Sequence, residues 1–347
     1  MKALVYTAVR TVEVHEVDMP VAGPTEVLVR VGATGICGSD IHGFLGHSSR
    51  RMPGLILGHE TVGIIEEGDE SLLGKRVTVN PLITCMLCPA CRAGRHNNCL
   101  NWRLLGMDQT HGGFGEYLTV PRRNVHPIPD SVHDEKAVMV EPLANAFHIL
   151  SMIPQSAGLA PTAVIVGGGT IGACIYAVAQ ARGLQILAVS EPNPKRQAIL
   201  EALGCRRVID PRSTDVADTI LAETNGQGVS LAIDAVGSSV TRNTCAKLVS
   251  RGGTALLLGL DEGTTSFDFF DLVRREVRLQ TSFAYTEQNY AEALDFVVNG
   301  AVDFTAWTTS MPTEQGQQAF ETLVNSPGQY LKIALVPTGR GLRGAMK

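Results

Sequence analysis

Four of the eight cysteines of this 347-residue chain lie in one short segment, TCMLCPACRAGRHNNC, at residues 84–99. They are Cys85, Cys88, Cys91 and Cys99, and this clustering in a chain of this length favours metal binding over disulfide bonds. Four thiolates supply a complete tetrahedral shell to zinc, which leaves no open position for water or a substrate. The segment therefore predicts a structural zinc site, and the alternative is a loop of four reduced thiols.

A catalytic zinc needs protein ligands and one open coordination position. Outside the cysteine cluster, suitable side chains are Cys37 in GICGSDIHG, His59 and Glu60 in LGHETVG, and Glu141 in VEPLA. Each residue also has a purely structural interpretation. Cys37 is then a buried thiol, His59 a hydrogen-bonded core histidine, and Glu141 a charge at a helix N-terminus. The spacing alone does not join them into one site.

A glycine-rich motif, VGGGTIG, directly follows the apolar run 162–166 and opens a helical pattern. Its residues include Gly167, Gly169, Thr170, Ile171 and Gly172. Glycines here permit a tight turn and let the backbone approach a pyrophosphate, while the helix N-terminus adds amide donors and a favourable dipole. The motif in this context predicts a dinucleotide site.

Glu191 ends the next predicted strand, about 20 residues beyond the last glycine of the motif. A carboxylate at this place accepts hydrogen bonds from the adenosine ribose and repels a 2′-phosphate, which favours NAD over NADP. Lys195 and Arg196 follow closely, and they either soften this selection or are solvated helix residues. We expect NAD as the cofactor, with Arg196 among the residues near it.

The first part of the chain, residues 1–145, consists of short segments separated by glycine and proline. Runs such as 2–6, 26–31 and 76–79 alternate between apolar and polar residues, which is typical of strands with one buried face. This pattern predicts an all-β, barrel-like domain, and residues 135–150 predict a helix that leads out of it.

Residues 146–285 follow a different pattern, in which continuous apolar runs alternate with helical segments. Such runs are expected of strands buried on both faces, and repeated strand–helix–strand units imply a parallel, doubly wound sheet. The predicted fold class is therefore α/β, with a Rossmann domain next to a β-rich one. Residues 286–347, with a helix at 287–298 and a strand at 331–337, are predicted to return to the first domain.

Composition limits the partners and the location. The net charge of −5 gives no basic surface for nucleic acid or anionic lipid, and no apolar run approaches the roughly 20 residues of a membrane span. The first residues alternate like a strand and lack the apolar core of a signal peptide, so a cytoplasmic protein is expected. The pairs Arg50–Arg51 and Arg122–Arg123 are isolated and are expected to be solvated.

Taken in order, these motifs resemble those of the zinc-dependent medium-chain dehydrogenases, on the branch of the sorbitol, butanediol and threonine dehydrogenases. The resemblance covers essentially the whole chain and rests on GICGSDIHG, PGLILGHETVG, the four-cysteine loop, HGGFGEY, VEPLA, VGGGTIG and DAVG. It implies a GroES-like catalytic domain and a Rossmann domain. It also implies that Cys37 and His59 bind a catalytic zinc, and that Glu60 or Glu141 binds it directly or through its water.

The resemblance further implies a zinc-bound alkoxide that passes hydride to the nicotinamide. Ser39 and His42 match the positions of a proton relay, and the alternatives are a turn residue and a surface histidine. Asp40 between them is expected to support the fold or a zinc ligand. Cofactor contacts are expected from Val236 in DAVG, from Gly259 and, loosely, from Lys332.

The expected substrate is a secondary alcohol or polyol, because the ethanol-oxidising branch of the family has a cysteine where Glu141 stands. A remote alternative is a zinc-free quinone reductase of the same superfamily. Relatives are usually dimers or tetramers, so a homo-oligomer is expected.

The segment 44–54 is expected to border the substrate channel. Arg50 or Arg51 there could meet a phosphate or carboxylate, which keeps a sugar acid, a sugar phosphate or L-threonine open as substrates. The alternative is a polar loop with solvated arginines. A polyhydroxylated substrate would instead meet the polar side chains His47, Ser48 and Ser49.

Overall fold

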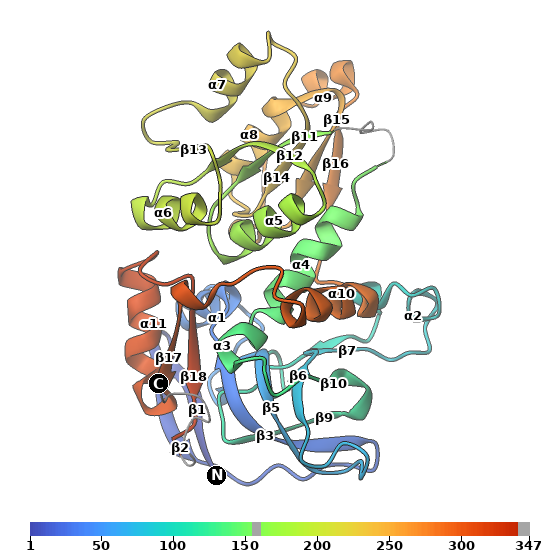
Figure 1. Cartoon of the computed structure of the whole chain (residues 1–347), viewed down its shortest axis with the longest axis vertical. Coiled ribbons are helices and arrows are strands. Elements are labelled where there is room, and N and C mark those ends of the chain that lie inside the picture. Colours follow the sequence, from blue (N-terminus) through green and yellow to red (C-terminus); the bar gives the residue numbers. More distant parts are fainter. Residues whose placement is uncertain (155–160, 339–347) are drawn as a thin grey trace. The chain divides into compact units, whose positions relative to one another are not determined.

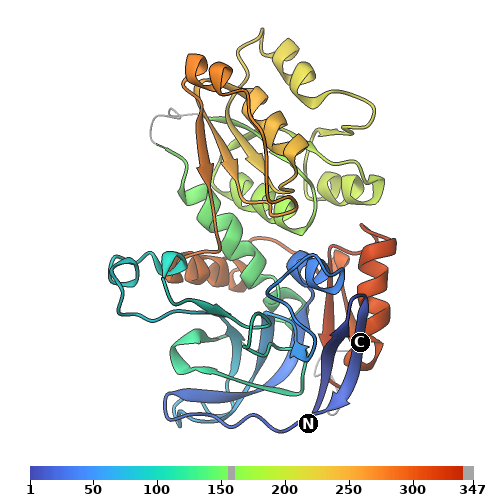
Figure 2. The same ribbon diagram turned by 180° about the vertical axis from the view of Figure 1, so that it is seen from behind.

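The computed structural model describes residues 1–154 and 161–338. These residues form two compact units. The first comprises Met1–Glu141 together with the chain from Thr286 onward, and the second comprises the described residues between Pro142 and Tyr285. Figures 1 and 2 show the chain from opposite sides. None of the helices in the described ranges is long and apolar enough to cross a membrane.

The first unit is built on a sheet with the strand order β10-β6-β5-β3-β18-β17, in which β9 also pairs with β3. All of these pairs are antiparallel except β17 with β18. Smaller sheets have the orders β2-β1-β4 and β7-β8. The strands are β1 (Lys2–Ala8), β2 (Thr11–Glu16), β3 (Glu26–Gly35), β4 (Leu55–Ile56), β5 (Glu60–Glu67), β6 (Arg76–Val79), β7 (Leu82–Ile83), β8 (Arg103–Leu104), β9 (Tyr117–Pro121), β10 (Val125–Pro127), β17 (Thr308–Pro312) and β18 (Lys332–Val336).

Alternation along β3 explains how this sheet encloses a core. Val27, Val29 and Val31 are spaced by two and therefore face the same side of the strand. They join Val77 and Val79 of β6 in one buried apolar cluster. The prediction of a β-rich domain from alternating segments is therefore confirmed.

Among the helices of the first unit, α1 is the one that carries residues of the site. Cys37 is the N-cap residue of α1, and the Asp40 side chain accepts a hydrogen bond from the Cys37 amide. The helices are α1 (Gly38–Phe44), α2 (Pro89–Arg92), α3 (Asp134–Ala137), α10 (Glu287–Val298) and α11 (Gly316–Asn325), with 3₁₀ turns at η1 (His96–Asn98), η2 (Arg122–Asn124), η4 (Thr305–Trp307) and η5 (Thr313–Gln315).

The second unit contains a parallel sheet in the order β13-β12-β11-β14-β15-β16. In chain order this is 3-2-1-4-5-6, the order of doubly wound dinucleotide-binding folds. The predicted fold class is therefore confirmed. The strands are β11 (Thr162–Val166), β12 (Gln185–Ser190), β13 (Val208–Ile209), β14 (Val229–Asp234), β15 (Val249–Leu257) and β16 (Arg278–Thr281).

Helices cover both faces of this sheet, with α5 and α8 on opposite faces (Figures 1 and 2). Because both faces are covered, its central strands are continuously apolar, as in TAVIV of β11. The helices are α4 (Val140–Ser151), which begins in the first unit, α5 (Thr170–Ala181), α6 (Pro194–Ala202), α7 (Val216–Glu223), α8 (Ser239–Leu248) and α9 (Phe269–Arg275).

The predicted helix at 135–150 is two helices, α3 and α4, separated at Val138 and Met139. The chain after residue 260 also contains α9, β16, β17 and α11, which were not among the elements named from the sequence. In β17 the sequence is TTSMP, which has no apolar alternation to indicate a strand.

Candidate metal centres and dinucleotide site

Three predicted zinc ligands come together in the first unit. One ligand atom each of Cys37, His59 and Glu60 lies within 4.8 Å of the others. The β3–β5 pairing brings them together, because Gly35 at the end of β3 is directly opposite Glu60 at the start of β5. A Cβ at Gly35 would lie 2.1 Å from Glu60 Oε2, so any other residue there would displace this carboxylate.

Asp40 supports this cluster from α1. Its Oδ2 accepts the Cys37 amide at 3.1 Å, and its Oδ1 lies 3.5 Å from His59 Nδ1. Burial raises the pKa of Asp40, but the charges and hydrogen bonds of His59, Arg51 and the Cys37 amide outweigh it and lower the pKa to about 2. A fixed anion behind Nδ1 orients the His59 ring and leaves Nε2 for another partner.

The cluster suits a cation. Burial lowers the pKa of His59, yet the negative charges of Asp40 and Cys37 raise it well above its usual value. Glu60 Oε2 is buried and has no hydrogen-bond partner. Sulfur, imidazole and carboxylate donors are the set that zinc prefers, so the residues present fit a zinc ion.

Glu60 is also held by Lys332 of β18. Lys332 Nζ lies 2.6 Å from Glu60 Oε1 and donates to the Ile36 carbonyl at 3.0 Å, and both charged side chains are 1% exposed. Burial lowers the pKa of Lys332, but Glu60 and Cys37 raise it more, so the ammonium stays charged. The structure therefore gives Lys332, which the resemblance loosely places at the cofactor, an ion-pair partner in Glu60.

The remaining residues predicted for this site are Glu141, Ser39 and His42. Glu141 lies at the start of α4 and is 8% exposed, but the structure does not bring it into the group of three. Ser39 and His42 are three residues apart on α1, a spacing that places them on one face of a helix. The His42 and His47 rings meet edge to face, with centroids 5.9 Å apart.

The two arginines of segment 44–54 have separate partners. Arg50 makes two hydrogen bonds to the Asp108 carboxylate, at 2.5 and 3.0 Å, and its guanidinium lies 4.1 Å from the centre of the Trp102 ring. Arg51 is 4% exposed and donates to Ser39 Oγ at 2.9 Å. The expectation that this pair is solvated is wrong for Arg51, because the sequence gives no sign of its buried partners.

The four clustered cysteines also converge. Their four sulfur atoms all lie within 4.8 Å of one another, and the four residues form no disulfide. Backbone amides donate to these sulfurs, among them the Cys88 amide to Cys85 at 3.3 Å and the Cys91 amide to Cys88 at 3.5 Å. Hydrogen bonds from the amides of Cys91 and Leu100 lower the pKa of Cys88 to about 6, while burial raises that of Cys91 to about 12. The four sulfurs fit a closed zinc site.

The glycine motif of the second unit forms the turn from β11 into α5. Gly167 has φ +103°, which only glycine adopts without strain, and Gly169 is the N-cap residue of α5. A Cβ at Gly172 would lie 1.8 Å from the Gly167 carbonyl oxygen, so this glycine allows the helix to approach the turn. Thr170 and Ile171 open α5, whose free amides form an anion site.

Glu191 directly follows β12, and its side chain binds the backbone of the glycine turn. Its carboxylate accepts the Gly168 amide and the Asn193 amide, each at 2.8 Å, and the residue is 2% exposed. Arg196 approaches the same turn, since its Nη1 lies 3.7 Å from the place of a Cβ on Gly169. The acidic and the basic side chain expected at the adenosine end therefore both reach the glycine turn.

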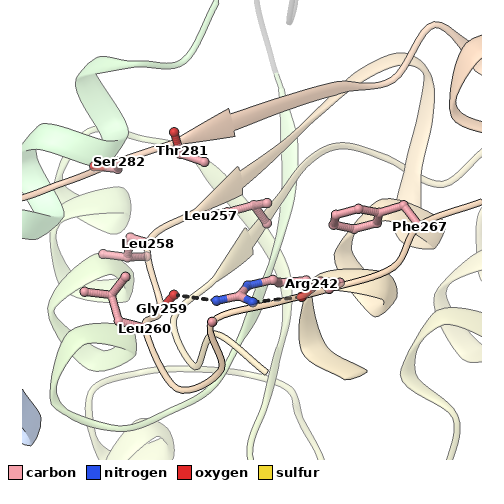
Figure 3. A pocket seen from close by; sticks show the side chains of 10 residues that line it. Arg242, Leu257, Leu258, Gly259, Leu260, Phe267, Thr281 and Ser282 are labelled. Carbon is pink, nitrogen blue, oxygen red and sulfur yellow. Dashed lines mark hydrogen bonds between the residues drawn. The ribbon is translucent and has the colours of Figure 1, made fainter. Parts of the chain in front are cut away.

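Val236 and Gly259 meet beside Gly167. The Val236 side chain lies 2.5 Å from the place of a Cβ on Gly167, and Gly259 touches the Val236 backbone. Gly259 lines a cavity of 280 Å³ at the carboxyl ends of β15 and β16, where ligands of parallel sheets bind. Figure 3 shows Arg242 in its wall, donating to the Gly259 carbonyl. Arg242 also donates a hydrogen bond to the Thr265 hydroxyl.

Comparison with known proteins agrees with this geometry. Residues 23–130 match the family described as "Alcohol dehydrogenase GroES-like domain", and residues 170–299 match "Zinc-binding dehydrogenase". Sorbitol dehydrogenase of Bacillus subtilis is 30% identical over 347 residues, 97% of each protein. L-threonine 3-dehydrogenase of Pyrococcus abyssi is 37% identical over 268 residues, 75% of this chain and 76% of that protein.

Among solved structures, a zinc-binding dehydrogenase of Sinorhizobium meliloti bound to NADP superposes with a TM-score of 0.87. It is 30% identical and covers 97% of this chain and 99% of its own. The matches extend over both units and include the segments that carry both cysteine-containing sites and the glycine turn. This chain belongs to the zinc-dependent medium-chain dehydrogenases, oxidoreductases that act on alcohol groups.

Proposed function

We propose that the protein oxidises a secondary alcohol or polyol with NAD, using a zinc ion held by Cys37, His59 and an acid. The observation that carries this proposal is the buried cluster of sulfur, imidazole and carboxylate donors, with Asp40 behind the imidazole. Zinc in such a site polarises a bound hydroxyl group and lowers its pKa. The same donor set argues against the zinc-free quinone reductase alternative.

The chain's own side chains provide the route for the proton. Ser39 accepts the proton of the substrate hydroxyl, and His42, on the same face of α1, passes it to solvent. A nicotinamide dinucleotide bound at the turn of Gly167 would accept the hydride from the carbon that carries the substrate hydroxyl. Glu60 and Glu141 are the two acids proposed for the metal, directly or through water.

A neutral polyhydroxylated substrate is favoured over a sugar phosphate or sugar acid. Both arginines of segment 44–54 already have carboxylate partners, Arg50 in Asp108 and Arg51 in Asp40. Their charges are therefore balanced within the protein. L-threonine stays as the second candidate, because the Pyrococcus abyssi relative is an L-threonine 3-dehydrogenase.

NAD is the proposed cofactor, because Glu191 places a carboxylate at the end of β12, where it opposes a 2′-phosphate. Arg196 near the turn would favour that phosphate, and the Sinorhizobium meliloti structure holds NADP. Replacing Glu191 with Gln should then raise the preference for NADP. A variant with unchanged NAD/NADP selectivity would assign the choice to other residues.

The decisive assay is reduced-cofactor formation by zinc-loaded protein, with NAD or NADP and a panel of diols, alditols, aldonic acids, sugar phosphates and L-threonine. Turnover of one vicinal-hydroxyl substrate with NAD supports the proposal, and metal analysis should give two zinc ions per chain. No turnover together with one zinc per chain would contradict it, because one of the two proposed zinc sites would then be empty.

We also propose that the protein is a homo-oligomer, a dimer or tetramer. The second unit exposes large apolar side chains, namely Val240, Leu260, Phe269, Phe270 and Val273. In the described chain β16 pairs only with β15, so one strand edge is open. Light scattering at the mass of a single chain would refute this.

A further inference from the structure

Arg51 is built into the first unit next to Ser39. Its Nη2 donates to Ser39 Oγ at 2.9 Å and lies 3.5 Å from Asp40 Oδ1. The aliphatic part of its side chain crosses α1 at Gly43, where a Cβ would lie 2.3 Å from Arg51 Cδ. A glycine in the helix therefore makes room for the arginine.

The hydrogen bond restricts what the Ser39 hydroxyl can do. A guanidinium only donates hydrogen bonds, so Ser39 Oγ must be the acceptor. A serine hydroxyl has one proton and two lone pairs, and Arg51 occupies one lone pair. One acceptor position and one O–H donor are left.

We propose that Arg51 is a positioning residue that leaves Ser39 with one acceptor and one donor position, so that Ser39 relays a proton in the proposed alcohol oxidation. The inference rests on the proposed function. The proton of the substrate hydroxyl forms a bond to the remaining lone pair of Ser39 Oγ as the original Ser39 proton leaves for the next acceptor. Ser39 ends neutral, and its bond from Arg51 is kept. The positive charge of Arg51 also opposes any state in which Ser39 retains both protons.

The test is a double-mutant cycle with Arg51→Gln and Ser39→Ala in the full-length, zinc-loaded protein. Thermal midpoints measure whether the two side chains interact, and kcat for the best substrate of the panel measures whether the interaction serves turnover. Arg76→Gln is the matched control, because Arg76 pairs with Asp134 and the Pro129 carbonyl instead of with the cluster.

We expect Arg51→Gln to lower kcat by roughly tenfold to a hundredfold, with KM changed by less than about threefold, because Arg51 acts on proton transfer and not on substrate binding. In the Ser39→Ala background the same change should lower kcat by less than about twofold. Arg51→Lys, which keeps a charged donor, should recover part of kcat. Zinc content should stay at that of the unchanged protein.

Equal losses of kcat in both backgrounds would overturn the proposal, as would a loss no larger than that of Arg76→Gln. Additive thermal midpoints would show that the two side chains do not interact, which also overturns it. If the unchanged protein turns over no substrate, the proposed function fails and the role of Arg51 fails with it. The thermal cycle is independent of turnover, so the two failures are distinguishable.

Discussion

At the scale of single residues, the site contains buried charges, each of which would destabilise the folded protein if it had no partner of opposite charge. Glu60 and Lys332 are both 1% exposed and bind each other at 2.6 Å. Two buried charges are stable only as a pair with further hydrogen bonds, which the Ile36 carbonyl supplies here. Lys332 binds Oε1 of Glu60 and leaves Oε2 without a hydrogen-bond partner, so the ion pair fixes the carboxylate with one oxygen available to a metal.

Replacing Lys332 with Met should therefore destabilise the protein by about 3 kcal/mol or more, because Glu60 would be left buried and unpaired. Chemical unfolding of the metal-free protein measures this loss. Lys247→Met is the control, since the Lys247–Asp218 pair is largely exposed and contributes at most about 1 kcal/mol. A Lys332→Met variant no less stable than the control would contradict the buried ion pair, and adding Glu60→Gln should restore part of the loss.

At the scale of elements, the β3–β5 pairing determines where the acid of the cluster lies. The pairing places Gly35 opposite Glu60, and α1 begins just after Gly35, with Cys37 at its N-cap. One strand end and one helix start therefore carry two of the three donors. A change in the β3–β5 pairing would separate them.

Gly35→Ala should disturb the cluster, because the added methyl group would lie 2.1 Å from Glu60 Oε2 and 3.1 Å from Lys332 Cδ. We expect lower zinc content and a lower thermal midpoint. Gly38→Ala is the matched control, as no atom outside its immediate chain neighbours and its own helix lies within 4 Å of a Cβ there. If metal analysis gives the same zinc content for both variants, the contact at Gly35 does not hold the acid in place.

The zinc site of the cysteine loop should be lost without affecting the site at Cys37 and His59. Cys88→Ser removes one of four sulfurs, so we expect zinc to fall from two ions to one per chain and the loop 84–99 to become sensitive to protease. Zinc analysis and limited proteolysis check this. Cys205→Ala, which alters a cysteine outside both clusters, should keep both ions. Loss of both ions from Cys88→Ser would mean that the two sites are not independent.

Elements and motifs were more predictable than ion pairs. TAVIV and the glycine turn are local patterns, so the sequence was sufficient to locate β11 and the start of α5. The cluster of Cys37, His59 and Glu60 required family resemblance, because pairing between strands is not visible in spacing. Arg51 was wrongly expected to be solvated for the same reason, and the ion pair of Lys332 with Glu60 was not foreseen, since most of the chain separates these two residues.

At the scale of the whole molecule, the first unit is closed by the returning end of the chain. Phe320 of α11 packs against Phe44 with tilted rings and against Phe114 edge to face, with ring centroids 5.0 and 6.0 Å away. β18 pairs with β3 and brings Lys332 to Glu60. The second unit, in contrast, is formed by one continuous part of the chain. We therefore expect the second unit to fold as a separate fragment, and the first unit to need both of its chain segments.

We expect residues 142–285 alone to fold and bind the dinucleotide, because they contain the whole parallel sheet and lack only the first two residues of α4. Residues 1–141 alone should fail to hold zinc at Cys37 and His59, since they lack β18 with Lys332 and the apolar side chains Phe320 and Ile333 of the same core. Joining 1–141 to 286–347 by a short flexible linker should restore zinc binding. Zinc analysis, circular dichroism and cofactor titration compare the three proteins. Because the cysteine loop of 1–141 should hold one zinc ion by itself, two zinc ions per chain in 1–141 alone would show that the returning segment is not needed to form the centre at Cys37 and His59.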